Sequence, residues 1–214
     1  TEIKKRNFYI IEDVSHCFLN ENFSFNKKND FFLSLRKHGI IGPGGWGSVN
    51  FNLKNKLSNY EKIYLKKNHK LRLKKNKFLS NDKYIKNEKF FLSSFQKINH
   101  SLNNIISNSS VNNIYKERIY NFDLNMLIKR RLNNWKYLNR LIDGKFEKIY
   151  TSVNKNRVPI GYIIFLKNRD RLRNFLIQKR IFCGIHWISK NIPIKNKSSF
   201  AKKMMTKSLT IPID

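Results

Sequence analysis

The 214 residues can form one large domain or two small ones, with enough chain to bury a hydrophobic core. Hydrophobic residues make up 40% of the chain and aromatic residues 14%, a composition that excludes a wholly disordered protein. The formal net charge of +30 permits nucleic-acid binding, but the basic residues are spread along the whole chain with asparagine, isoleucine and phenylalanine, so AT-rich coding bias explains the charge better.

The sequence lacks the signals of membrane insertion, secretion and disulfide bonding. No run reaches the roughly 18 apolar residues that a membrane span requires. The N-terminal stretch TEIKKRNFYII has too short an apolar part for a signal peptide. Cys17 and Cys183 lie far apart, which is typical of a reducing compartment. We therefore expect a cytoplasmic protein without a membrane partner.

Three short apolar runs near the N-terminus predict strands. Residues 8–11 form the first run and lead into a Glu-Asp pair, residues 30–35 form the second, and residues 46–53 form the third. The Gly-Pro-Gly-Gly sequence at 42–45 predicts a turn. Carboxylates at the C-terminal end of a buried strand stand where open α/β sheets hold their ligands.

The middle of the chain predicts helices with a long basic exposed face. Residues 55–105 are rich in lysine and asparagine, and their apolar residues recur at helical spacing. These apolar residues are Leu65, Leu71, Leu73, Phe78, Phe90, Phe91 and Phe95. Residues 103–113 predict a loop, and residues 123–143 predict an amphipathic helix that starts at an Asp123 cap and ends at Gly144.

The C-terminal part predicts a compact α/β arrangement. Residues 159–166 predict a strand, and residues 168–180 predict a helix that opens at Asn168 or Asp170. Residues 181–187 are apolar again and predict a second strand. This strand–helix–strand order is typical of a small α/β domain.

Two polar segments at strand ends are candidates for chemistry. Asp13 and His16 follow the first strand, where a carboxylate can pair with a cationic nitrogen, although a surface turn is the simpler interpretation. Ser34 and Lys37 follow the second strand, and a partly desolvated lysine there can act as a Schiff-base amine. Among 44 lysines and arginines, however, any single lysine is ordinarily surface charge. The glycines at 42–45 match neither the P-loop nor the dinucleotide-binding spacing.

Histidine and cysteine side chains raise the possibility of a zinc site. His16-Cys17 and Cys183-x-x-His186 supply the ligand types that zinc prefers. Neighbouring residues of an extended strand point to opposite faces, so His16 and Cys17 could hardly reach one ion. We therefore expect no metal.

Several short motifs follow one another in a definite order along the chain. The N-terminal ones are Glu12-Asp13-Val14-Ser15-His16, Ser34-Leu35-Arg36-Lys37 and Gly44-Gly45. The C-terminal ones are Arg131-x-x-Asn134, Val158-Pro159, Asn168-Arg169-Asp170, Ile181 to His186-Trp187, and Leu209 to Pro212-Ile213-Asp214. In this order they resemble the DegT/DnrJ/EryC1/StrS family of sugar aminotransferases, which use pyridoxal 5'-phosphate (PLP).

The resemblance implies an α/β fold: part of the large domain of a PLP-dependent transferase of fold type I, with an open mixed sheet, plus a small α/β C-terminal domain. Residues 1–75 would form the second half of the PLP-binding domain, residues 76–122 connecting helices and a loop, and residues 123–214 the small domain. Family members are longer, so we expect this chain to be the C-terminal portion of such an enzyme, truncated at the N-terminus.

The resemblance also assigns roles to the residues at the strand ends. Lys37 would form the Schiff base with PLP and move the proton between the substrate carbon and the cofactor carbon. Asp13 would keep the pyridine nitrogen protonated, and His16 would lie beside the ring. Ser34 would donate to the phosphate, and the glycines after Lys37 would give the backbone clearance beneath the cofactor.

The implied activity is transfer of an amino group from an amino acid such as glutamate to a keto sugar, for example a nucleotide-linked one, in polysaccharide or amino-sugar biosynthesis. His186 and Trp187 would border the substrate pocket, and the full-length form would be a homodimer without a specific nucleic-acid partner. Two alternatives stay open: a non-enzymatic basic protein associated with RNA or ribosomes, and an inactive fragment of the family.

Overall fold

The structure is a computed structural model. It describes residues 10–17, 19–20, 30–38, 45–48, 57–80, 88–100, 117, 119–186 and 198–214. At Arg36, Lys37 and Glu88 the side chains lie outside the described part. None of the helices that the structure describes combines the length and the apolar composition needed to cross a lipid bilayer.

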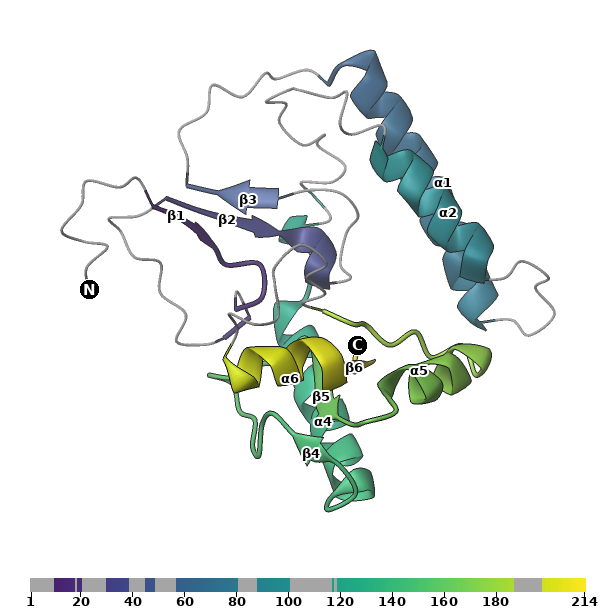
Figure 1. Cartoon of the computed structure of the whole chain (residues 1–214). Coiled ribbons are helices and arrows are strands. Elements are labelled where there is room, and N and C mark those ends of the chain that lie inside the picture. Colours follow the sequence, from purple (N-terminus) through teal and green to yellow (C-terminus); the bar gives the residue numbers. More distant parts are fainter. Residues whose placement is uncertain are drawn as a thin grey trace. The chain divides into compact units, whose positions relative to one another are not determined.

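The chain divides into two compact units. The N-terminal unit consists of Thr1–Ser15 and Phe25–Phe122, and the C-terminal unit of His16–Ser24 and Asp123–Asp214. Each unit contains a three-stranded sheet and helices, so the fold is mixed α/β (Figure 1).

The N-terminal sheet has the strand order β1-β2-β3. Its strands are β1 (Ile11–Asp13), β2 (Asp30–Ser34) and β3 (Gly45–Gly47). β1 runs parallel to β2, with Asp13 opposite Phe32, and β3 runs antiparallel to β2, with Ser34 opposite Gly45. β2 confirms the predicted strand at residues 30–35. β1 shares only Ile11 with the predicted buried run at residues 8–11, of which residues 8 and 9 lie outside the described part, and none of its three residues is buried. The parallel and antiparallel pairs together form a mixed sheet.

Glycine allows β3 to lie close against β2. A Cβ atom at Gly45 would lie 2.9 Å from the carbonyl oxygen of Leu33, and one at Gly47 would lie 2.8 Å from that of Phe31. Residues 42–44 of the predicted turn lie outside the described residues. At Gly45 and Gly47, the absent side chains therefore give clearance to the backbone of the neighbouring strand.

The lysine- and asparagine-rich middle contains the predicted helices. α1 (Asn59–Ser80) and α2 (Glu88–His100) pack against each other as an antiparallel pair, with the rings of Phe78 and Phe91 5.1 Å apart (Figure 1). The buried side of α1 consists of Tyr64, Asn68, Leu71 and Phe78. Leu73, which helical spacing had placed among the apolar contacts, is 50% exposed.

The C-terminal sheet is antiparallel with the order β4-β5-β6. Its strands are β4 (Glu147–Lys148), β5 (Gly161–Phe165) and β6 (Ser208–Pro212), and its helices are α4 (Leu124–Ile142), α5 (Arg169–Gln178) and α6 (Ser199–Lys207).

Helices cover both faces of β5. On one face, Trp135 of α4 packs on Tyr162 with ring centres 5.2 Å apart. On the other, Phe200 of α6 contacts Phe165 with ring centres 6.5 Å apart. A strand buried on both faces needs a continuous apolar sequence rather than an alternating one, and the GYIIF sequence of β5 meets that need.

α4 begins and ends where the sequence predicts. The Asp123 side chain accepts a hydrogen bond from the backbone N–H of Met126 at 2.9 Å, which caps the helix N-terminus. Beyond the helix, Gly144 adopts a φ of 71°, a left-handed conformation that favours glycine. α5 also follows its predicted Asn168 boundary, although the Asn168 side chain makes no capping hydrogen bond.

The predicted strand at residues 181–187 is wrong over its described part. Within 181–186, only Gly184 pairs with a strand, exchanging backbone hydrogen bonds of 3.0 and 2.9 Å with Thr210. A Cβ at Gly184 would lie 2.8 Å from Nε2 of the His186 side chain, so the imidazole packs against the glycine. The strand that pairs with β5 is instead β6, at the C-terminus of the chain.

Candidate functional site

The carboxyl ends of β1 and β2 lie at the same edge of the N-terminal sheet. Asp13 is the last residue of β1 and Ser34 the last residue of β2, and the two strands are parallel. The pairing continues past Asp13, because the N–H of Val14 donates to the carbonyl of Phe32 at 2.9 Å. The structure thus brings two of the predicted site residues to one edge, the position at which α/β sheets bind ligands.

Ser15 connects these two strand ends. Its backbone N–H donates to Oδ1 of Asp13 at 3.0 Å, and its hydroxyl oxygen accepts from the backbone N–H of Ser34 at 2.8 Å. Ser15 is only 3% exposed. We assigned it no role from the sequence, although an Asp-x-Ser sequence after a strand is typical of the turn in which a carboxylate binds the N–H two residues on.

Replacing Ser15 tests this connection. Ser15→Ala leaves the part-buried N–H of Ser34 without its acceptor, so we expect a loss of about 1–3 kcal/mol in the free energy of unfolding. Ser48→Ala is the matched control, because its hydroxyl accepts from the N–H of Phe31 on the same strand but the residue is exposed. Urea unfolding followed by circular dichroism measures both. Equal losses in the two variants would show that the buried Ser15 hydroxyl contributes no more to the free energy of unfolding than the exposed Ser48 hydroxyl.

A single turn of 3-10 helix, η2 (Leu35–His38), follows β2 and contains Lys37. His38 at its end is buried, with 2% exposure, and fixes the turn in the unit. The backbone therefore holds Lys37 within one turn of Ser34, while its side chain lies outside the described part of the structure.

The chemistry of this edge fits PLP. Asp13 is exposed, with one carboxylate oxygen held by the N–H of Ser15, and can pair with a protonated ring nitrogen. Ser34 carries a hydroxyl, a donor of the kind that phosphate oxygens accept from, and Lys37 follows in the next segment as an amine-bearing residue type. The edge carries an acid and a hydroxyl, and the backbone of Lys37 follows within one turn of Ser34.

The other predicted site residues are less well placed by the structure. His16 is exposed in the turn after β1, and His186 is half-buried in the C-terminal unit. Trp187 lies outside the described residues. The roles of His16, His186 and Trp187 therefore rest on the sequence resemblance alone.

The described residues show no metal centre. No group of three or more histidine, cysteine, aspartate or glutamate side chains gathers among them in a way that could hold an ion. Cys183 is buried, and burial raises the pKa of its thiol, so the group stays protonated at neutral pH.

A partly buried ion pair joins two of the C-terminal motifs. The side chain of Arg131 on α4 has no exposed surface and pairs with the carboxylate of Asp214. One helical turn away, the amide of Asn134 donates to the carbonyl oxygen of Ile213 at 3.0 Å. The Arg-x-x-Asn and Ile-Asp motifs therefore bind each other, a structural role that we did not assign from the sequence.

A polar cluster ties the end of α4 to the sheet. Nζ of Lys148 donates to Asn139 at 2.7 Å and to Asp143 at 2.6 Å, and the Tyr162 hydroxyl donates to Asn139 at 3.1 Å. The hydrogen bond from Lys148 lowers the pKa of Asp143, and burial raises the pKa of Tyr162. Tyr162 is thus a neutral donor at pH 7 rather than a base, so the cluster is structural.

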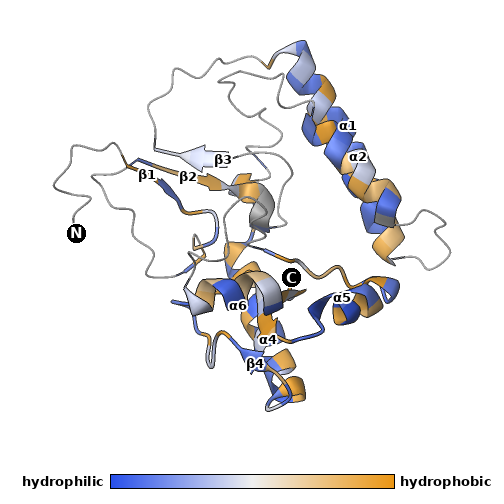
Figure 2. Ribbon diagram, viewed as in Figure 1, coloured by the Kyte–Doolittle hydropathy of each residue, from blue (hydrophilic) through white to orange (hydrophobic). Residues whose placement is uncertain are grey.

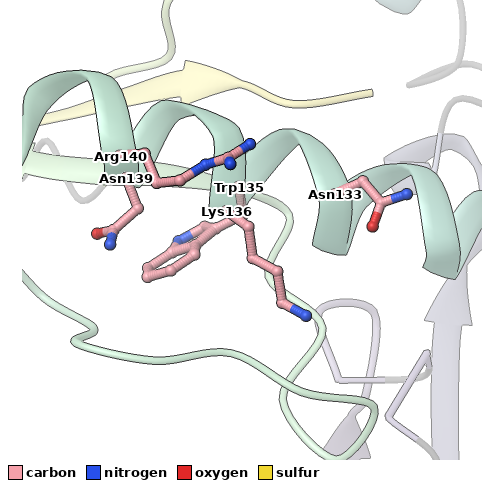
Figure 3. Close-up of a pocket in the computed structure, with 5 residues that line it drawn as sticks. All are labelled: Asn133, Trp135, Lys136, Asn139 and Arg140. Carbon is pink, nitrogen blue, oxygen red and sulfur yellow. The ribbon is translucent and has the colours of Figure 1, made fainter.

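Two cavities of small-molecule size lie along α4. One of about 490 Å³ is lined by Asn133, Trp135, Lys136, Asn139 and Arg140, all from this helix (Figure 3). The other, of about 610 Å³, is lined by apolar, lysine and asparagine side chains. Its lining includes Leu19, Leu124, Ile128, Leu132, Asn20, Asn125, Asn133, Lys129, Lys136 and Lys155. None of these described lining residues is acidic, so both cavities favour anionic ligands.

Comparison with known proteins identifies structural relatives among solved structures. No protein-family model matches the chain, and no curated protein matches it. Among solved structures, the chain is similar to a DegT DnrJ EryC1 StrS aminotransferase from Brucella abortus, with a TM-score of 0.50 and 14% sequence identity. The match covers 99% of this chain and 54% of the aminotransferase, so the chain spans about half of the length of that protein. At this identity, the likeness shows a shared mixed α/β fold.

Proposed function

We propose that this chain carries part of the active site of a PLP-dependent aminotransferase, with PLP at the carboxyl ends of β1 and β2. The observation that carries the proposal is the joining of Asp13 to Ser34 through Ser15, directly before the turn that contains Lys37. The fold likeness to an aminotransferase supports it independently of the motifs.

Each residue at this edge has a distinct role. When bound, PLP supplies a ring that withdraws electrons from the substrate carbon. The Asp13 carboxylate holds the proton on the ring nitrogen, and the Ser15 N–H keeps that carboxylate oriented. The Ser34 hydroxyl donates to the phosphate. Nζ of Lys37 would hold the cofactor through its aldehyde carbon. Once the substrate amine has displaced it, the free Lys37 amine would move the proton at the substrate carbon.

The substrate assignment follows the sequence resemblance. The amino donor is an amino acid such as glutamate, and the acceptor is a keto sugar, for example one linked to a nucleotide. By that resemblance, His16 would lie beside the ring, His186 and Trp187 would border the sugar, and the enzyme would work as a homodimer in amino-sugar or polysaccharide biosynthesis. In the family that the chain resembles, members with a histidine at the position of Lys37 are dehydratases. The lysine in this chain therefore favours transamination.

Asp13→Asn tests the site on the full chain. Loss of a charge-assisted hydrogen bond worth about 1.5–3 kcal/mol corresponds to PLP binding that is roughly 10- to 100-fold weaker. Asp30→Asn is the matched control, because Asp30 lies at the other end of β2 and accepts from the Ser48 hydroxyl at 3.0 Å. Equilibrium titration with PLP, followed by absorbance, measures both. Equal affinity of the two variants would contradict the assignment of Asp13.

A further inference from the structure

α1 presents lysines on a side separate from its buried residues. The buried stripe contains Tyr64, Asn68, Leu71 and Phe78. The exposed lysines of α1 are Lys62, Lys66, Lys67, Lys70, Lys74 and Lys77. At about 100° per residue, these six side chains fall within an arc of roughly 140°. We call this side the lysine face. Figure 2 shows hydrophilic residues recurring along α1.

The lysine face carries charge of one sign. The one carboxylate within α1, Glu61, takes part in a capping box: it accepts from the N–H of Ser58 at 2.6 Å, and the Ser58 hydroxyl accepts from the N–H of Glu61 at 3.2 Å. The remaining basic residues of α1 are directed elsewhere. Arg72 donates to Asn68 at 2.8 Å, and Nζ of Lys75 lies 5.9 Å from the ring centre of Phe95.

The spacing of the charges suits a repeating anion. Lys62, Lys66, Lys70 and Lys74 follow at intervals of four residues, which separates successive charges by roughly 6 Å along the helix axis. Like charges at this spacing repel and destabilise a helix. A chain of regularly spaced phosphates removes that repulsion and gains binding free energy by releasing its own counterions.

We infer that the lysine face binds the phosphate backbone of nucleic acid without reading its sequence. An anionic membrane fits less well, because a helix that binds a bilayer needs a free apolar side, and the apolar side of α1 is covered by α2 through the Phe78–Phe91 contact. Ile63 and Leu73 are the exposed apolar residues within the lysine face, so no aromatic ring lies in that arc to stack on bases. This inference is independent of the proposed enzymatic function.

Two quadruple variants with equal net charge test the inference. The face variant replaces Lys62, Lys66, Lys70 and Lys77 with glutamine. The control variant replaces four exposed lysines of the C-terminal unit with glutamine: Lys145, Lys167, Lys179 and Lys202. Binding of a fluorescent mixed-sequence DNA duplex is measured by anisotropy over a range of salt concentrations. The plot of log K against log salt has a negative slope. The magnitude of this slope is expected to decrease by about three to four in the face variant and by less than about one in the control.

An arginine variant and a binding measurement on lipid vesicles distinguish nucleic-acid binding from the alternative explanations. Arginine at the four face positions is expected to restore binding, because it keeps the charge, and circular dichroism confirms that all variants retain their helices. Equal loss of duplex binding in the face and control variants would overturn the inference, since total charge would then explain binding. Loss of binding to vesicles of anionic phospholipid, with duplex binding unchanged, would also overturn it and assign the face to membranes.

Discussion

Asp214→Ala is expected to lower the free energy of unfolding of the C-terminal unit by about 3 kcal/mol. The substitution leaves the guanidinium of Arg131, which has no exposed side-chain surface, without its carboxylate. A charge held away from water and deprived of its partner carries the full cost of desolvation. Asp214 itself is 48% exposed on its side chain, so we place the expected loss at the low end of the range for buried pairs.

An exposed ion pair in the same unit provides the control. Asp170 pairs with Arg169 at 3.0 Å, but its side chain is 73% exposed, so Asp170→Ala is expected to cost less than about 1 kcal/mol. Urea unfolding is followed by the fluorescence emission of Trp135, which packs on Tyr162. The other two tryptophans are removed by Trp46→Phe and Trp187→Phe, so that Trp135 alone emits. If Asp214→Ala costs no more than Asp170→Ala, the ion pair is not a main support of this unit.

Removing both charges distinguishes the ion pair from simple packing. Methionine fills much of the volume of Arg131 without a charge, so Arg131→Met combined with Asp214→Asn is expected to recover part of the lost free energy. A double variant as unstable as Asp214→Ala would mean that the loss comes from packing around the C-terminus.

Lys37→Ala is expected to abolish the absorbance band at about 410–430 nm that forms when the protein is mixed with PLP. The band requires an amine bonded to the cofactor aldehyde, and alanine offers none. Lys62→Ala is the control, because Lys62 is an exposed lysine of α1. A band of undiminished intensity in Lys37→Ala would show that PLP reacts with other lysines of this basic chain.

Local signals predicted much of the fold. The start and end of α4 follow from Asp123, whose carboxylate caps the helix, and from Gly144, which adopts the left-handed conformation. β2 and β5 follow from their apolar runs. In each case the physical cause lies within a few residues of the signal, so a single sequence contains enough information.

Features of the fold that depend on interactions between residues far apart in the sequence could not be predicted in this way. The apolar run after α5 predicts a strand, but the register with β6 allows only Gly184 to pair, and this depends on a segment that follows α6. In α1, spacing favours Leu73 as a core residue, whereas the structure buries Asn68 because Tyr64 and Arg72 satisfy its amide. Pairing and hydrogen-bond partners of this kind cannot be derived from periodicity.

The candidate site also contains residues that could be predicted from the sequence and one whose role could not. Asp13 and Ser34 could be selected because strand ends are visible in the sequence. The role of Ser15 depends on the parallel pairing of β1 with β2, which brings its hydroxyl to the N–H of Ser34. The sequence motif contains Ser15, but the contact that gives it a role is tertiary.

Mapping the lysine that PLP modifies tests the central claim most directly. The full chain is mixed with one equivalent of PLP, the adduct is fixed with borohydride, and its peptides are identified by mass spectrometry. We predict that the label is found on the peptide that contains Lys37, and that it is reduced in Asp13→Asn but not in Asp30→Asn. Label spread over the exposed lysines of α1, with none at Lys37, would contradict the proposed site.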